Sequence, residues 1–158
     1  MKQKKPRPEP GDAAAVRLAA LDLLALREHS RRELERKLDA RGFDADVIAG
    51  ALDRLATDGL QSDARFAEQF IHSRMQRGSG PQKIRAELRE RGVDAADIGL
   101  AMEALDGDWL ALLRSVREKK FGSELPGDYR ERARQMRFLQ QRGFSSAQIG
   151  RLFRDTDD

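Results

Sequence analysis

An eleven-residue pattern occurs three times in the chain, and it constrains the fold more than any other feature. The copies are LDARGFDADVI, LRERGVDAADI and LQQRGFSSAQI, which begin at Leu38, Leu88 and Leu139. Similarity at a regular spacing of this size indicates a repeat architecture, in which each repeat is one supersecondary unit that stacks on its neighbours. The sequence therefore predicts three related units.

Each copy has the residues of a helix end, a tight corner and a helix start. A leucine supplies the last buried contact of one helix, and an Arg-Gly pair ends that helix, because glycine readily adopts the left-handed conformation required there. The apolar residues expected to fill the corners are Phe43, Val93 and Phe144. The residues expected to cap the following helices are Asp44, Asp94 and Ser145. Ser30 and Glu33 also have the spacing of a capping box.

A further helix is predicted before each copy, over residues Ala13–Glu28, Ser62–Arg77 and Asp108–Phe121. The fold class is therefore all-α, with three tandem three-helix repeats stacked into an elongated, curved body. The expected boundaries are 13–58 for the first repeat, 59–106 for the second and 107–154 for the third. A disordered basic tail is expected over residues 1–12, and a short acidic tail over 155–158.

The sequence contains no recognisable catalytic or metal-binding motif. It has no cysteine, which excludes disulfides and thiolate metal sites. His29 and His72 are far apart and belong to no helical metal-binding motif, so we expect both at the surface. The Gly-rich stretch at Gly78–Pro81 lacks the strand and the Gly-Lys pair of a phosphate-binding loop. We therefore expect no catalytic residue, no metal, no cofactor and no enzymatic activity, and the absence of a signal peptide or membrane-length apolar run predicts a cytoplasmic protein.

Charge alternates in blocks along the chain, with +4 over residues 65–91, −5 over 92–113 and +7 over 114–154. This pattern favours a polyanion or an acidic protein surface as partner, although ordinary solvated helix faces give similar runs. Aromatic residues are few, at 6% of the chain, so stacking on single-stranded bases has little support. The cations expected to form a partner-binding basic face are Arg74, Arg77, Lys83, Arg85, Arg89, Lys119, Lys120, Arg130, Arg134 and Arg137.

The stretch from Asp63 to Val93 resembles the RecX family of bacterial recombinase regulators. The residues that carry the resemblance are Asp63, Phe66, Ala67, Phe70, Arg74, Gly78, Gly80, Pro81, Ile84, Glu87, Leu88, Arg91, Gly92 and Val93. The similarity covers about residues 15 to 154 and is looser in the outer repeats. In the third repeat Gln135 stands where Leu34 and Ile84 stand, so we expect Met136 and Phe138 to take over its packing.

The resemblance implies a regulator that binds the RecA recombinase filament on single-stranded DNA and suppresses its strand exchange, ATP hydrolysis and co-protease action. We expect the basic face to lodge in the filament groove, with single- or double-stranded DNA phosphates as a further candidate contact. The protein is expected to be a monomer without membrane contact. For Arg74, a salt bridge that holds the corner is as good an interpretation as a partner contact. The motif residues expected to be structural are Asp63, Phe66, Phe70, Gly78, Gly80, Pro81, Ile84, Leu88 and Gly92.

Two other functions remain open at this point. A three-helix unit with a short corner also resembles a helix-turn-helix, so the chain could bind DNA without a recombinase partner. A helical scaffold for some other acidic partner would have the same composition. Tight, sequence-dependent binding to duplex DNA would favour the first alternative, and recovery of a different partner from cell lysate would favour the second.

Overall fold

The computed structural model describes residues 6–105 and 107–155, and within these residues the protein has nine helices and no strand. Unit 1 contains α1 (Ala13–Leu26), α2 (Arg31–Ala40) and α3 (Ala45–Thr57). Unit 2 contains α4 (Asp63–Gln76), α5 (Pro81–Glu90) and α6 (Ala95–Ala104). Unit 3 contains α7 (Trp109–Phe121), α8 (Tyr129–Gln141) and α9 (Ser146–Asp155). The predicted all-α class is confirmed.

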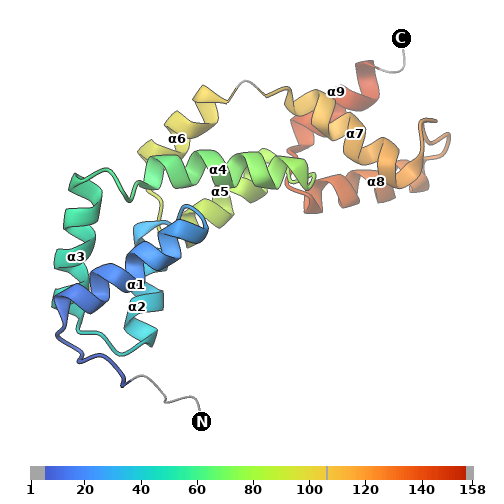
Figure 1. Cartoon of the computed structure of the whole chain (residues 1–158). Coiled ribbons are helices and arrows are strands. Elements are labelled where there is room, and N and C mark those ends of the chain that lie inside the picture. Colours follow the sequence, from blue (N-terminus) through green and yellow to red (C-terminus); the bar gives the residue numbers. More distant parts are fainter. Residues whose placement is uncertain (1–5, 106, 156–158) are drawn as a thin grey trace.

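The three units follow one another along an elongated, bent body, with the two chain ends at opposite ends (Figure 1). Each unit has its own cluster of buried apolar side chains, and among residues 6–105 and 107–155 no single cluster contains buried residues of all three units. Trp109 is a shared element, because it packs against the clusters of both unit 2 and unit 3. None of the helices in the described part of the chain has the length and apolar character needed to cross a bilayer.

The three corners adopt the predicted geometry. Gly42, Gly92 and Gly143 have φ angles of +89°, +80° and +100°, in the left-handed region that favours glycine. The apolar residue after each glycine is buried, with exposed fractions of 5% or less. Local sequence therefore determines how each pair of helices is joined.

Helix capping follows the prediction at all but one position. Ser30 and Glu33 form the predicted capping box, and Asp94 accepts a hydrogen bond from the backbone N–H of Asp97 at 2.8 Å. Asp44 was predicted to cap α3, and this prediction is wrong, since its side chain makes no capping hydrogen bond. Its backbone N–H donates to the carbonyl of Pro10 at 2.9 Å instead. The segment before α1 therefore covers the corner of unit 1. Pro10, which makes this contact, belongs to the tail 1–12 that was expected to be disordered. Residues 1–5 of that tail lie outside the described residues.

The third unit differs from the other two at its core. Gln135 remains buried, with 3% exposure, and Met136 and Phe138 pack against the unit 3 cluster as partly buried side chains. These two residues pack as expected, although Gln135 itself stays buried beside them. The repeat register is kept even though it buries an amide whose oxygen has no hydrogen-bond partner.

Successive units are joined by docking the corner of one unit on the start of the second helix of the preceding unit. Gly80 and Gln82, at the start of α5, donate backbone hydrogen bonds to the carbonyls of Arg142 and Gly143 at 2.7 and 3.0 Å. The Ser30 hydroxyl, at the start of α2, donates to the carbonyl of Arg91 at 2.7 Å. Helices α8, α5 and α2 thus meet end to end, with the negative end of one dipole against the positive end of the next.

Candidate partner-binding surface

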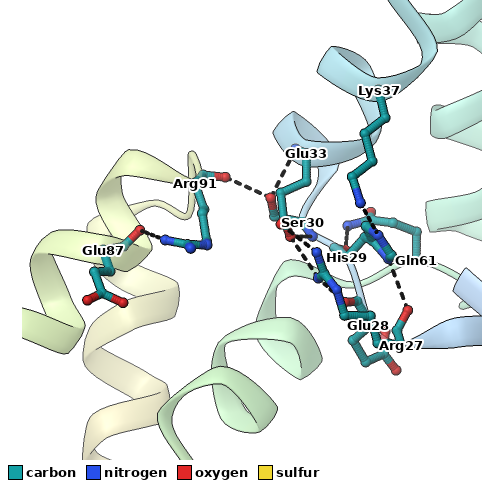
Figure 2. A network of polar contacts seen from close by, with 9 residues as sticks. All are labelled: Arg27, Glu28, His29, Ser30, Glu33, Lys37, Gln61, Glu87 and Arg91. Carbon is teal, nitrogen blue, oxygen red and sulfur yellow. Dashed lines mark hydrogen bonds and ion pairs between the residues drawn. The ribbon is translucent and has the colours of Figure 1, made fainter. Parts of the chain in front are cut away.

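The junction between units 1 and 2 is built largely from polar side chains (Figure 2). Arg27 pairs with Glu33 through two contacts of 2.9 and 3.2 Å, and Glu33 also accepts from the backbone of Ser30. Burial opposes the charge on Glu33, but the hydrogen bonds from Arg27 and Ser30 outweigh it and hold its pKa below the usual value. Glu33 is therefore committed to holding the junction.

Two carboxylates and a histidine complete this junction. Asp63 accepts from the backbone N–H of Arg31 at 2.8 Å, and Arg65 pairs with Glu28 at 3.0 Å. His29 was expected at the surface, and this prediction is wrong, since only 1% of the residue is exposed. Its sequence neighbourhood is charged, which is why the sequence alone suggested an exposed position.

The imidazole of His29 is held in its neutral form. Its Nδ1 lies 3.0 Å from the Arg27 carbonyl, and its Nε2 lies 3.0 Å from Nζ of Lys37, which suits a donating Nδ1–H and an accepting Nε2. Burial lowers the pKa of His29, and the positive charges of Arg27 and Lys37 lower it further, against the hydrogen bond to the Arg27 carbonyl.

A groove of about 390 Å³ lies beside this junction, between α4 and the start of α2. Arg74 lies in it, but its Nε pairs with Glu87 at 2.8 Å and its guanidinium lies over the Phe70 ring at 4.6 Å. Arg91 lies over the same ring at 4.7 Å. This groove also contains Glu28 and Glu33, so its positive charges are partly compensated from within.

A second groove, of about 320 Å³, lies at the junction of units 2 and 3, between the end of α4 and the helices α7 and α8. We call it the basic groove. Its cations are Arg77, Lys119, Lys120 and Arg142. Its apolar side chains are Met75, Leu112, Val116 and Phe138. No carboxylate occurs among its described lining residues, which distinguishes it from the groove at the first junction.

The predicted basic face divides between this groove and two helix surfaces. Arg77, Lys119 and Lys120 line the basic groove, and Arg77 also lines the first groove. The exposed cations of α5, outside both grooves, are Lys83, Arg85 and Arg89. The exposed cations of α8, also outside both grooves, are Arg130, Arg134 and Arg137. Of these six, Arg134 is partly neutralised by its pairing with Glu131 at 2.8 Å.

Sequence reasoning missed Arg142, which closes the basic groove. Its guanidinium donates to the carbonyl of Arg77 at 3.2 Å and lies over the ring of Phe138 at 5.3 Å. The available signal was the Arg-Gly pair that occurs in all three repeats, interpreted only as a helix end. Within the described residues there is no cluster of three or more His, Asp or Glu that could hold a metal ion. The cations of the basic groove can bind anionic groups such as carboxylates or phosphates.

Family models match the chain in three consecutive segments. They are the first, second and third three-helix domains of RecX, matched at residues 17–55, 62–102 and 106–153. The chain belongs to the RecX family. Regulatory protein RecX of Ectopseudomonas mendocina (strain ymp) is 51% identical over 144 residues, which is 91% of this chain and 96% of that protein. The RecX of Halorhodospira halophila (strain DSM 244 / SL1) is 51% identical over 135 residues, 85% of this chain and 84% of that protein.

Solved RecX structures have the same fold. The crystal structure of RecX from Lactobacillus salivarius aligns with a TM-score of 0.78 and 24% sequence identity, covering 92% of this chain and 97% of that one. A second crystal structure, of a regulatory protein RecX, aligns with a TM-score of 0.77 and 21% identity, covering 92% of this chain and 73% of that one. The resemblance inferred from residues 63–93 is thereby confirmed, and the expectation of a regulator instead of an enzyme agrees with the family.

Proposed function

We propose that this protein binds the RecA recombinase filament on single-stranded DNA and inhibits its strand exchange, ATP hydrolysis and co-protease action. Membership of the RecX family supports RecA as the partner. The observation that carries the mode of binding is the basic groove, a set of four cations without a carboxylate among the described lining residues. Such a surface attracts an acidic protein face or a phosphate backbone without first breaking an internal ion pair.

The shape of the body suits a filament. Three units in line present the basic groove and the cations of α5 and α8 along a bent rod, and a filament offers the same protomer surface repeatedly. Several weak contacts made at once give an avidity well above that of any single contact. We propose that the rod lodges in the filament groove, where it obstructs incoming duplex DNA, and that DNA phosphates add contacts to the same face.

A helix-turn-helix that acts alone is less well supported. The helix after the corner would have to enter the major groove. In unit 2 this helix is α6, which contains no lysine or arginine, and its exposed residues include Leu100 and Glu103. The surface of α6 offers little to a DNA backbone, so unit 2 gives no support to sequence-specific duplex binding.

The test is inhibition of RecA ATPase and strand exchange on single-stranded DNA by charge-reversed variants. We expect Arg77→Glu combined with Lys119→Glu and Lys120→Glu to weaken inhibition at least tenfold, a loss of about 1.4 kcal/mol in binding. Arg130→Glu combined with Arg134→Glu and Arg137→Glu should weaken it less, because these cations lie outside the groove. Helicity and melting should change little in either variant.

The matched control is the triple reversal Arg36→Glu, Arg41→Glu and Arg54→Glu in unit 1. It changes the net charge equally, and all three residues are exposed. If the control loses inhibition as strongly as the groove variant, only net charge matters and the basic groove is not the contact. Full ATPase and strand exchange in the presence of excess wild-type protein would overturn the proposed function itself.

A further inference from the structure

The basic groove is lined by apolar side chains as well as by cations. The cations come from the ends of α4 and α7 and from the corner after α8. Met75, Leu112 and Val116 are half-buried and supply apolar surface between them. A ligand that fills the groove therefore meets methyl and methylene groups in its interior and positive charge around them.

The aromatic ring of the groove is already engaged. Phe138 has Lys120 over its ring at 5.5 Å and Arg142 at 5.3 Å, and it makes an edge contact with Phe121 at 5.3 Å. In proteins that bind single-stranded nucleic acid, the bases stack on aromatic side chains whose faces are free. The basic groove offers no such platform, and its apolar interior would gain nothing from contact with a sugar-phosphate backbone.

Two of the four cations have contacts that position them before any ligand arrives. Arg142 is held by the carbonyl of Arg77 and by the Phe138 ring, and Lys120 is held by the same ring. At the first groove, by contrast, Arg74 and Arg27 already pair with Glu87 and Glu33. Carboxylates that enter the basic groove therefore need not displace a carboxylate of the described lining, and Arg142 and Lys120 lose less entropy on binding than unrestrained side chains would.

We propose that the basic groove is a docking site for an acidic peptide segment that carries one apolar side chain, with the apolar group on Met75, Leu112 and Val116 and the carboxylates on the surrounding cations. This assignment rests on the proposed function only in that the segment would belong to a protein of the recombinase filament. The charge complementarity and the apolar interior favour a peptide over a nucleic acid. Methionine is suited to such a site because its flexible thioether adapts to different apolar groups.

The experiment measures fluorescence anisotropy of the full chain with a labelled peptide in which glutamates flank a single phenylalanine. A second peptide has serine in place of the phenylalanine, and unlabelled oligothymidylate serves as competitor. We expect the phenylalanine peptide to bind at least about fivefold more tightly than the serine peptide, since burying one apolar side chain contributes about 1 kcal/mol or more. The oligonucleotide should compete weakly.

Variants locate the binding. Lys119→Glu with Lys120→Glu should weaken peptide binding at least about tenfold. Ser115→Glu should also weaken it, because it places a carboxylate at the exposed Ser115 in the groove lining without altering a core residue. The matched control is Arg36→Glu with Arg41→Glu, which makes the same change of charge at exposed residues of unit 1 outside the groove and should bind normally.

The proposal is overturned if neither peptide binds, if the two peptides bind equally, if the groove variants bind as well as the control, or if the oligonucleotide binds more tightly through the same residues. The assay contains no recombinase, so its outcome is separate from that of the proposed function. Inhibition of RecA without peptide binding removes the docking site alone. If the peptide binds but the protein has no effect on RecA, the docking site is supported and the recombinase filament is excluded as its partner.

Discussion

At the junction of units 2 and 3, the backbone of Gly80 touches the backbone of Gly143, whereas the equivalent contact between units 1 and 2 is made by the side chain of Ser30. A Cβ placed on Gly80 would lie 2.4 Å from the carbonyl carbon of Gly143. Ser30 has a Cβ at the equivalent position, and its hydroxyl donates a hydrogen bond to the Arg91 carbonyl of the next unit. The presence or absence of one side chain therefore decides whether two units meet through backbone or through side chains.

The chemistry of the two junctions follows from this difference. The first junction contains a neutral buried histidine and several ion pairs, and the backbone N–H of Arg31 is satisfied by the carboxylate of Asp63. The second junction brings two helix ends into direct hydrogen bonding and shares Trp109 between two cores. We therefore expect the first junction to respond to pH and salt, and the second to respond chiefly to the volume of the residues in contact.

The largest expected effect is that of Gly143→Ala. The new Cβ would lie 2.4 Å from Cβ and 2.8 Å from the backbone N of Lys83, so the two units would have to separate. We expect a loss of about 3 kcal/mol in the free energy of unfolding, from the clash together with the left-handed backbone. The measurement is denaturant unfolding followed by the fluorescence of Trp109, the single tryptophan, which lies at this junction.

The matched controls are the equivalent glycines of the other corners. Gly42 has a similar φ but open space around it, so Gly42→Ala should cost only about 1–2 kcal/mol for the backbone conformation. The three atoms nearest to a Cβ on Gly92 belong to the Arg32 side chain, with the Arg32 Cβ at 2.7 Å, so Gly92→Ala should fall between the two. Equal costs at all three corners would contradict the distinction between the junctions.

Ser30→Ala should have the next largest effect. It removes the cap of α2 and the hydrogen bond to Arg91 in the next unit, for a total of about 2 kcal/mol. Ser145→Ala is the control, because Ser145 makes the same kind of capping box with Gln148 but no bond to another unit, and it should cost about 1 kcal/mol. Identical losses in thermal or denaturant unfolding would mean that the bond between units contributes nothing.

The pH dependence of the first junction is expected to be smaller. The pKa of His29 is lowered from 6.5 in the folded protein. Below about pH 6.5, therefore, the unfolded chain binds a proton at His29 more readily than the folded chain does. The free energy of unfolding should therefore fall as pH decreases from about 7 to about 5.5, above the range in which Glu33 loses its charge. His29→Gln, which keeps a donor and an acceptor, should remove most of this slope. A stability that rises with acid in the wild type would refute the assigned neutral state.

The smallest effect is expected for the ion pair of Arg65 with Glu28, which joins units 1 and 2 at 3.0 Å with the arginine 45% exposed. A double-mutant cycle of Arg65→Gln and Glu28→Gln should give a coupling of about 0.5 kcal/mol, decreasing at high salt. A coupling above about 2 kcal/mol would show that this pair, and not the Ser30 contact, holds the first junction.

Much of the local structure could be predicted from the repeat. The corner glycines, the capping box of Ser30 and the buried residue after each glycine depend on neighbours within a few positions, so the sequence pattern is sufficient. Asp44 makes no side-chain cap, and its backbone N–H donates to Pro10, a contact with a more distant segment that the local pattern does not reveal. His29 failed as a surface residue because it is covered by contacts that sequence spacing does not reveal.

The candidate partner-binding surface was only partly predictable. Arg77, Lys119 and Lys120 were identified as cations, but the same reasoning gave equal weight to Arg85 and Arg89, which lie outside the grooves. Charge along the chain identifies candidates, whereas the pairing of each candidate with a carboxylate depends on how the units pack. Arg74 shows this, because its nearest carboxylate is Glu87, thirteen residues away on the next helix.

By itself, the sequence determined the number of units, their helices and the turns that join them, because caps, glycines and apolar spacing act over one or two turns of chain. Only the tertiary structure decided which side chains meet between units. Arg77, Lys119 and Arg142 come from three different parts of two units and form one groove because Gly80 lets those units approach to backbone contact. A side chain at that position would hold the two units further apart, as Ser30 does at the first junction, and no local sequence pattern fixes how these cations would then lie.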